Sequence, residues 1–428
     1  MKEGQNKVKK LGIIFVVLLL CISVTTVWAQ EKINIVHYHW SQPPYDEINA
    51  NAAKTFMEKY PNVNVEIMFF ADPDMPTKVR TAILGGGGMD TFAMPNMQSA
   101  WFMANGLCAE IMPSAFGKET LEEVLNMWEE GSLQKTGGFY NGKYYGIPFE
   151  MSSYVAWINT GHMKEAGLDP VANLPKTWKE FVDACSKMTV RQNDVIVRNG
   201  FAINLKASVF PFLVLHSFME QKGLDWPTEQ GLLDSLDTPE ALEALTTFTN
   251  FATQDGIFNP GLFDDEREGF GNGLCSTFLT GGSWYWGVLD SYSVDREDVT
   301  PMPYPRFEDG EDIGGPVYGY CVFVAEQSKN KEWAWKWLDH LASQPEAFIE
   351  HGYYQPRKSL DPTLADKYIL NNDIFDAERR KGAALLASPK FSETQDAVGE
   401  AIRRVVFGGM SNEESLNALK EELSDILE

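Results

Sequence analysis

The sequence Ile33-Asn34-Ile35-Val36-His37 begins the segment that decides the fold. Its β-branched and apolar residues predict a strand, which leads into a polar loop at 38–44 and a helix over 46–60. Residues 61–67 alternate apolar with polar side chains and predict a second, half-buried strand. A strand, helix, strand, helix, strand order is typical of a parallel sheet with helices on its faces. The pattern continues with a helix at 78–84 and a strand at 91–94.

A second lobe is expected further along the chain. Residues 148–303 are rich in helix patterns, and Thr177 and Thr238 have the side chains that begin helices. A strand is expected at 313–324 and a helix at 330–342, whereas Ser411 and Glu414 predict a capping box on a C-terminal helix. A chain of 428 residues exceeds one ordinary core, and no Gly/Ser-rich linker divides it. Two α/β lobes joined by several short crossings are therefore expected.

The N-terminus predicts a secretory signal peptide over residues 1–29. Four lysines precede the uncharged run 11–27, and Val27-Trp28-Ala29 suits a signal peptidase. A membrane anchor is the alternative, but the run is short for a span and the cleavage pattern follows it directly. Cys21 follows three leucines rather than small residues, which argues against a lipoprotein. The mature protein is expected to be soluble in the periplasm.

The charge of the chain excludes some partners. Without residues 1–29, 32 basic and 59 acidic residues remain, a formal charge of −27. Nucleic acid and anionic membranes are poor partners for such a chain. Scattered acids of this kind commonly serve solubility alone and identify no ligand.

The cysteines left after cleavage show no CxxC spacing, which argues against a zinc site or a redox motif. One or two disulfides are possible in an oxidising compartment, and Cys275 with Cys321 is the first pair to test. Buried free thiols are the alternative. The four cysteines are Cys108, Cys185, Cys275 and Cys321.

Motifs for catalysis, phosphate binding or metal binding are weak or absent. Gly85 to Gly88 follow the end of a predicted helix and do not precede the start of one. They therefore indicate a helix stop and not a phosphate-binding loop. His37 and His39 have the spacing of metal ligands on a strand, but polar residues at a cleft entrance are the preferred interpretation. The Gly281 to Tyr285 segment lacks the second glycine of a nucleophile elbow. No metal or cofactor is expected, although two facing carboxylates of a glycoside hydrolase stay possible.

Two aromatic features suggest a cleft. The adjacent rings Trp284, Tyr285 and Trp286 cannot all face a core, so at least one should be exposed or in a cleft. Trp40 lies on a polar loop after a strand, where the ligand crevice of an open α/β sheet is found.

Several segments together resemble one family, the extracellular solute-binding proteins of the carbohydrate-uptake type that serve ABC transporters. The likeness covers nearly the whole mature chain and depends on the order and spacing of these segments. They are Gly142-Lys143-Tyr144-Tyr145-Gly146-Ile147-Pro148-Phe149-Glu150, Trp157-Ile158-Asn159, Ala166 to Pro170, Leu174 to Phe181, Thr280-Gly281-Gly282-Ser283-Trp284 and Lys329 to Trp335.

The resemblance implies a two-lobed periplasmic binding protein fold. Each lobe would be a mostly parallel sheet flanked by helices, discontinuous in sequence, and the lobes would close on a ligand about hinge crossings. The crossings are expected near 148–150, 301–305 and 344–351. The first lobe would comprise 30–147 plus 304–350, and the second 148–303 plus 351–428.

The resemblance also implies the ligand-binding residues. Glu150 would accept hydroxyl hydrogen bonds from a sugar, although a solvated or ion-paired acid is the alternative. Trp284 would pack against a sugar ring, Trp286 would add a second wall or lie in the core, and Arg357 would reach the cleft or pair with an acid at the hinge. The expected ligand-binding residues are Trp40, Ser41, Gln42, Asn96, Glu150, Trp284, Trp286, Tyr318 and Arg357.

The implied function is that of a monomeric receptor for an ABC importer. It would bind a mono- or oligosaccharide, make and break no bond, and deliver the ligand to membrane permease subunits driven by a separate ATPase. The alternatives are the same fold binding a polyol or amino compound, and a secreted carbohydrate-active hydrolase that uses Glu150 with a second acid.

Overall fold

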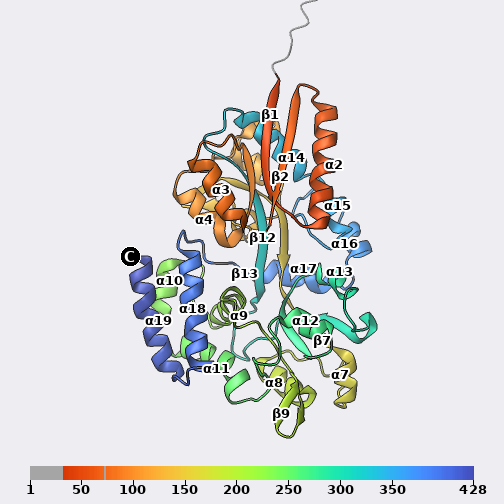
Figure 1. Cartoon of the computed structure of the whole chain (residues 1–428), viewed down its shortest axis with the longest axis vertical. Coiled ribbons are helices and arrows are strands. Elements are labelled where there is room, and N and C mark those ends of the chain that lie inside the picture. Colours follow the sequence, from red (N-terminus) through yellow and green to blue (C-terminus); the bar gives the residue numbers. More distant parts are fainter. Residues whose placement is uncertain (1–31, 72–73) are drawn as a thin grey trace, which may run out of the picture.

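The computed structural model describes residues 32–71 and 74–428, so the predicted signal peptide at residues 1–29 lies outside the described residues. Within these ranges the chain forms an upper and a lower lobe in the view of Figure 1, with the long strand β12 (Gly314–Val324) between them. None of the helices in these two ranges is long and apolar enough to cross a membrane. The predicted two-lobed α/β fold is confirmed.

The upper lobe begins with the predicted alternation of strands and helices. β1 pairs in parallel with both β2 and β3, because each helix returns the chain to the end of the sheet at which β1 begins. The glycines after α3 end that helix as predicted, and Gly86 and Gly88 have φ values of +67° and +69° that favour glycine. The elements are β1 (Ile33–Trp40), α2 (Pro43–Lys59), β2 (Val63–Phe70), α3 (Met75–Leu84), β3 (Thr91–Pro95) and α4 (Asn96–Ala104).

β1 is longer than the sequence predicts. Tyr38, His39 and Trp40 were expected in a loop, but they continue the strand. His39 pairs with Phe69 and Trp40 with Phe70 in the parallel register of β1 and β2. Pairing with the neighbouring strand therefore decides the end of β1, and local polarity does not.

β12 joins the upper sheet to the lower lobe. It lies between β3 and β13, and it also pairs with β6 in an antiparallel ladder that includes Tyr318 opposite Ser152 and Tyr320 opposite Glu150. Among the described residues the upper sheet has six strands and is mixed, because β12 is antiparallel to β3 and β6. The elements between β3 and β12 in the upper lobe are η2 (Pro113–Phe116), α5 (Leu121–Leu125), α6 (Ser132–Lys135), β4 (Phe139–Tyr140), β5 (Lys143–Tyr144) and β6 (Gly146–Ser153).

The sheet of the lower lobe differs from the prediction of a mostly parallel sheet. Its strands have the order β10-β7-β11, and both pairs are antiparallel. The predicted helices that begin after Thr177 and Thr238 are confirmed, with each threonine as the cap. The elements are β7 (Val155–Asn159), α7 (Thr160–Glu165), α8 (Trp178–Met188), β8 (Val190–Gln192), β9 (Val195–Arg198), α9 (Val209–Gln221), α10 (Glu229–Ser235), α11 (Pro239–Thr253), α12 (Glu266–Gly271), β10 (Thr277–Gly281), α13 (Tyr285–Leu289), η3 (Arg296–Asp298) and β11 (Val299–Met302).

The C-terminal part of the chain returns to both lobes. The predicted capping box of Ser411 and Glu414 begins α19, whose Leu416, Leu419 and Leu423 are buried. α18 and α19 pack on the lower lobe, as Figure 1 shows. The elements after β12 are α14 (Lys331–Leu341), α15 (Pro345–Ile349), α16 (Pro362–Tyr368), α17 (Asn372–Lys381), β13 (Gly382–Ala383), α18 (Phe391–Val406) and α19 (Asn412–Leu427).

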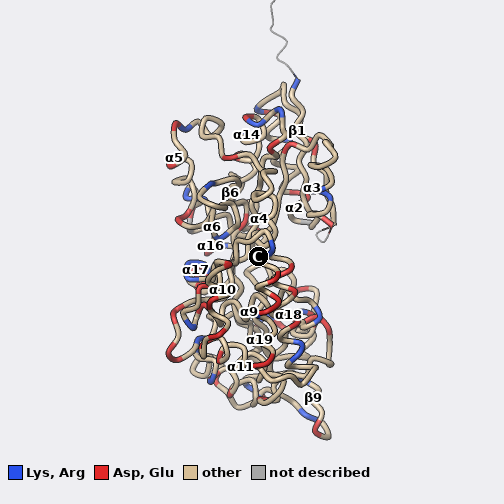
Figure 2. Tube along the Cα trace, turned by 90° about the vertical axis from the view of Figure 1, so that its left-hand side faces the viewer, with Lys and Arg blue, Asp and Glu red and all other residues tan. Residues whose placement is uncertain are grey.

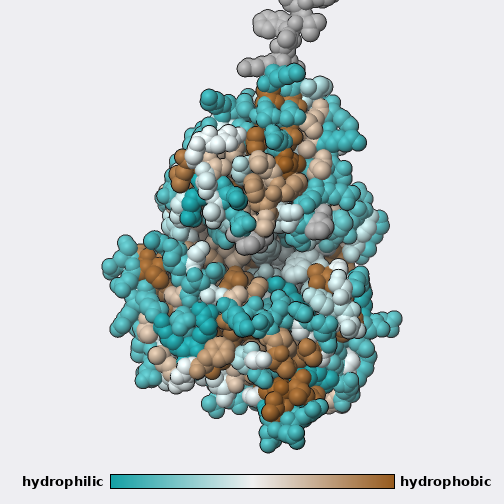
Figure 3. Space-filling view, in the orientation of Figure 1, coloured by the Kyte–Doolittle hydropathy of each residue, from teal (hydrophilic) through white to brown (hydrophobic). Residues whose placement is uncertain are grey.

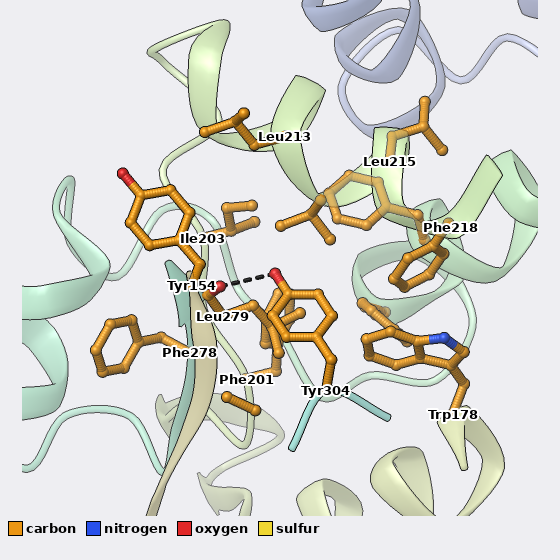
Figure 4. Close-up of a cluster of buried hydrophobic side chains, with 14 of the residues drawn as sticks. Tyr154, Trp178, Phe201, Ile203, Leu213, Leu215, Phe218, Phe278, Leu279 and Tyr304 are labelled. Carbon is orange, nitrogen blue, oxygen red and sulfur yellow. Dashed lines mark hydrogen bonds between the residues drawn. The ribbon is translucent and has the colours of Figure 1, made fainter. Parts of the chain in front are cut away.

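Buried apolar side chains form two main cores, one in each lobe. The upper core draws on residues 35–149 and 320–353, and the lower core on 154–307 and 369–423. Figure 4 shows part of the lower core, where the Tyr304 hydroxyl donates to the Leu279 carbonyl at 2.7 Å. The domain boundaries stay a prediction. That prediction assigns Tyr304 and Phe307 to the first lobe, whereas both side chains pack in the lower core.

All four cysteines among the described residues are buried free thiols, which matches the alternative interpretation and leaves the Cys275–Cys321 pair unformed. Cys275 lies in the lower core and Cys321 in the upper one, so the two sulfurs belong to different lobes. Cys321 instead lies 3.1 Å from the Thr136 hydroxyl.

Candidate functional site

A cavity of about 410 Å³ lies between the two lobes. In the view of Figure 3, which has the orientation of Figure 1, the surface is hollowed between the upper and lower parts of the molecule. The upper lobe contributes β1, β6 and α2 to α4, and the lower lobe contributes α9, α12 and α18. The described lining residues are Trp40, Gln42, Tyr45, Met75, Pro76, Pro95, Met97, Gln98, Glu150, Tyr154, Val209, Phe210, Arg267, Trp284, Tyr318, Tyr320, Tyr353, Phe391, Ser392 and Gln395.

Glu150 is a buried acid in the wall of this cavity, with 1% of its surface exposed. It lies on β6, and its Oε2 accepts a hydrogen bond from the Tyr45 hydroxyl. Its Oε1 is buried and has no hydrogen-bond partner among the described residues. Burial raises the pKa of Glu150 to about 8, against the opposing effect of the Tyr45 hydrogen bond. At neutral pH the acid therefore mostly keeps its proton, and it is neither a solvated surface group nor part of an ion pair.

Trp40 lines the cavity, but its ring faces are already covered. It stacks on Tyr320 with ring centroids 3.6 Å apart and on His39 with centroids 4.0 Å apart. Two rings stacked this closely must lie on opposite faces of the indole, so only its edge can meet a ligand. His39 and His37 are themselves fully buried, with His37 Nδ1 2.8 Å from the Thr91 hydroxyl. The interpretation of these histidines as polar residues at the cleft entrance is therefore wrong.

Trp284 has the ring that is open to the cavity. It is half-buried and packs against the edges of both cores, whereas Tyr285 and Trp286 beside it are buried. The expectation that at least one of these three rings faces a cleft is confirmed. Gly282 makes room for the indole, because a Cβ there would lie 2.8 Å from Trp284 Nε1 and 2.6 Å from Ser152 Oγ.

Gln42 and Tyr318 complete the group of predicted residues that the structure brings into the cavity. The Gln42 side chain donates to the Tyr353 hydroxyl at 2.7 Å. Tyr318 lies on β12 and, like Trp284, packs against both cores. Five of the nine predicted residues therefore meet in one place: Trp40, Gln42, Glu150, Trp284 and Tyr318.

Ser41 and Asn96 lie close to the cavity without lining it. Ser41 is exposed, and its hydroxyl donates to Asp46 at 2.9 Å. The Asn96 amide is buried and donates to the carbonyls of Lys135 and Val317 at 3.0 and 2.9 Å. These bonds hold the start of α4 against β12, so the Asn96 side chain is already used by the fold.

Arg357 and Trp286 also lie outside this cavity. Arg357 pairs with Asp339 at 2.8 Å and lies over the Trp128 ring, which matches its alternative interpretation as an ion-pair partner. Trp286 is buried, and its Nε1 donates to the Leu370 carbonyl at 3.0 Å. It lines a neighbouring cavity of about 410 Å³, which shares Gln42, Trp284 and Tyr353 with the first.

Fifteen of the twenty described lining residues were missed by sequence reasoning, among them Tyr45, Arg267 and Tyr353. Tyr45 follows the Pro43-Pro44 pair and lies one turn beyond Gln42, so its place near the predicted loop was a usable signal. Arg267 is a single cation within the acidic run 264–268, which was also visible. Tyr353 follows a helix end and carries no comparable signal.

The comparisons with known proteins agree with this geometry. Residues 39–347 match the family described as bacterial extracellular solute-binding protein. This chain belongs to that family. The description of the family names extracellular proteins that bind solutes.

This solute-binding protein is similar to named sugar-binding proteins over most of its length. The maltotriose-binding protein of Pyrococcus abyssi is 24% identical over 87% of this chain and 77% of its own length. An ABC substrate-binding protein of Listeria monocytogenes, solved with cycloalternan, superposes with a TM-score of 0.76 at 18% identity and covers 93% of this chain and 99% of its own. A solute-binding protein of Thermotoga lettingae, solved with α-D-tagatose, has a TM-score of 0.73 at 23% identity and covers 92% of this chain and all of its own. The two solved structures bear on the fold alone.

Proposed function

We propose that this protein is the substrate-binding receptor of an ABC importer and that it encloses a mono- or oligosaccharide between its lobes. The observation that carries the proposal is the half-buried Trp284 ring in a cavity whose walls also hold the hydroxyl groups of five tyrosines. Saccharides have apolar ring faces that stack on aromatic rings and hydroxyl groups that need hydrogen-bond partners. The tyrosines are Tyr45, Tyr154, Tyr318, Tyr320 and Tyr353.

Closure of the lobes on the ligand is the second part of the proposal. β6 and β12 form a two-stranded crossing between the lobes, and a bend in these strands would change the width of the cavity. Trp284 and Tyr318 pack against both cores, so a ligand that touches them would favour one arrangement of the lobes. The closed form would dock on membrane permease subunits that have a separate ATPase.

Binding without catalysis is favoured over hydrolysis. Glycoside hydrolases use two carboxyl groups that face each other across the bond. Glu150 is the one carboxylic acid among the described residues that line the cavity. Its Oε2 is also held by Tyr45, which leaves a single oxygen for a ligand. The second acid of a hydrolase therefore has no candidate among the described lining residues.

An amino compound suits the cavity less well than a saccharide. Glu150 is buried and mostly uncharged at neutral pH, and Arg267 is the basic side chain of the described lining. An ammonium group would therefore meet a positive charge without a carboxylate to offset it. A polyol stays an alternative ligand, because it has the same hydroxyl groups without the ring.

The setting of this receptor is proposed from the family and the charge. It would work in the periplasm as a monomer, and nucleic acid would be no partner for a chain with a formal charge of −24.

Thermal unfolding with a panel of saccharides, polyols and amino acids tests the proposal, after unfolding and refolding to remove any bound ligand. A saccharide at about a thousand times its Kd is expected to add about 4 kcal/mol to the free energy of unfolding, a rise of several degrees in Tm. The sugar should be recovered intact. Cleavage of the sugar would favour the hydrolase, and a rise in Tm with non-saccharides alone would contradict the proposed ligand class.

A further inference from the structure

Arg267 brings a positive charge to the cavity. It is the second residue of α12, and it is half-buried on the side of the lower lobe that faces the upper one. Among the described lining residues, it and Glu150 are the two with basic or acidic side chains. Whether the cavity favours a neutral or an anionic ligand should therefore depend on which groups pair with Arg267.

The guanidinium of Arg267 is held in a fixed orientation. Its Nε and Nη2 both donate to the Thr280 carbonyl, at 3.0 and 2.7 Å. Its central carbon lies 4.6 Å from the centre of the Phe210 ring and 5.3 Å from the centre of the Trp284 ring. An arginine fork that is fixed in advance loses less side-chain entropy when it binds a ligand. Because Thr280 takes the edge formed by Nε and Nη2, the edge formed by Nη1 and Nη2 is left for other partners.

No described carboxylate forms an ion pair with Arg267 within 4.0 Å. Glu266, the adjacent acid, is buried and accepts instead from the Thr280 hydroxyl and the Asn204 backbone N–H. Asp265 caps α12 by accepting the backbone N–H groups of Arg267 and Glu268. The Tyr154 hydroxyl is a neutral hydrogen-bond partner of the guanidinium, which leaves its other N–H groups for a ligand. The positive charge of Arg267 is therefore not neutralised by a carboxylate in direct contact with the guanidinium.

The sign of the charge in the cavity is opposite to that of the whole molecule. The chain has a formal charge of −24, and Figure 2 shows many acidic residues over the helices of the lower lobe. Glu150 lies in the cavity wall, but a buried acid without a cationic partner holds its proton at neutral pH. A protein with so many acids has thus placed a guanidinium in its ligand cavity, and the described acids near it form no ion pair with it.

We propose that the ligand is an acidic saccharide whose carboxylate pairs with the fork of Arg267 while its ring stacks on Trp284. The inference rests on the proposed function and narrows the ligand to sugars of the uronic acid type. A carboxylate is planar and can accept two parallel N–H bonds from the free edge of the fork. The uncharged Glu150 can donate its proton to a ring hydroxyl or ring oxygen without repelling the acid.

Matched pairs of acidic and neutral sugars test the inference, with binding followed by calorimetry. The probes are galacturonic acid with its dimer and trimer, glucuronic acid, and the neutral parent of each. A charge-assisted pair at Arg267 is expected to make the acid bind about 10- to 100-fold more tightly than its neutral parent. The preference should fall as salt is raised, whereas binding of a neutral sugar should change little.

Variants of Arg267 separate the charge from the fold. Arg267→Gln should abolish the preference for the acid, and Arg267→Lys should restore part of it, because lysine keeps the charge and loses the fork. Arg306→Gln is the matched control, since Arg306 pairs with Asp312 on the surface and should leave the preference unchanged. The Tm of each free variant shows whether the fold is kept.

Three outcomes would overturn the inference. They are binding of the neutral sugar as tightly as its acid, a preference for the acid that survives in Arg267→Gln, and a neutral saccharide as the ligand found by the wider thermal panel. In each case the proposed function still stands. Tighter binding of glucose 6-phosphate than of glucuronic acid would indicate that the anionic group of the ligand is a phosphate and not a carboxylate. If no saccharide of either kind binds, the proposed function itself fails.

Discussion

The substitution Glu150→Gln is expected to stabilise the free protein strongly at pH 8 and only weakly at pH 5. Below pH 4.5 the acid is protonated in both the folded and the unfolded chain. Between pH 4.5 and 8 the folded protein keeps a proton that the unfolded chain releases, because burial raises the pKa to about 8. The free energy of unfolding therefore falls by about 1.4 kcal/mol for each pH unit in this window, on the order of 4 kcal/mol in total. Glutamine resembles the protonated acid and escapes this loss.

Thermal or denaturant unfolding of both proteins between pH 5 and 8.5 measures the difference. The groups that face Glu150 are tyrosines, whose pKa values are raised by burial, so none of them titrates in this window. Glu47→Gln is the matched control, since Glu47 is exposed on the helix that carries Tyr45. A difference that is independent of pH would contradict a buried, protonated Glu150. The four tyrosines that face Glu150 are Tyr45, Tyr154, Tyr318 and Tyr353.

The substitution Trp284→Ala is expected to weaken saccharide binding by about 30- to 100-fold. A central aromatic anchor typically contributes 2 kcal/mol or more to binding, because its face excludes water from the ligand. Calorimetric titration with the saccharide that raises Tm most measures the loss. Trp284→Phe keeps an aromatic face and should recover a large part of the affinity.

Trp226→Ala supplies the opposite result for comparison. Trp226 is fully buried in the lower core, and its Nε1 donates to Ser235 at 2.8 Å. Its removal is expected to cost about 3 to 5 kcal/mol of stability and to leave the Kd of the folded protein unchanged. If Trp284→Ala lowers Tm as much as Trp226→Ala and keeps the Kd, then Trp284 serves the fold and not the ligand.

The order of elements could be read from the sequence, because hydrophobic patterns and caps are local. Thr177 and Ser411 begin helices as expected, since a capping box needs residues only three positions apart. The end of β1 could not be read, because Trp40 stays in the strand through pairing with Phe70, a residue of another strand. The antiparallel lower sheet was missed for the same reason, since strand direction depends on which strands meet.

The candidate site could be predicted only in part. Glu150 and Trp284 lie on segments that the family resemblance places at the cleft, and the structure brings both to the cavity. The resemblance also implies Asn96 and Arg357 as ligand-binding residues, but their polar groups bond to a carbonyl and a carboxylate of the same lobe. A sequence lists donors and acceptors without showing which of them the fold has already used. The role of Arg267 depends on the acids that fail to reach it, and that is a property of the folded chain.

The central place of β12 also has a consequence for the order in which the protein is made. β3 and β6 both form their ladders with β12, although more than 150 residues separate the end of β6 from the start of β12 in the chain. Until Gly314–Val324 has been synthesised, both earlier strands have an open edge that other chains can pair with. The strands β3 and β6 of the N-terminal half therefore stay incompletely paired until β12 has been made. Slow synthesis across the lower lobe should promote aggregation, and a chaperone that covers strand edges should relieve it.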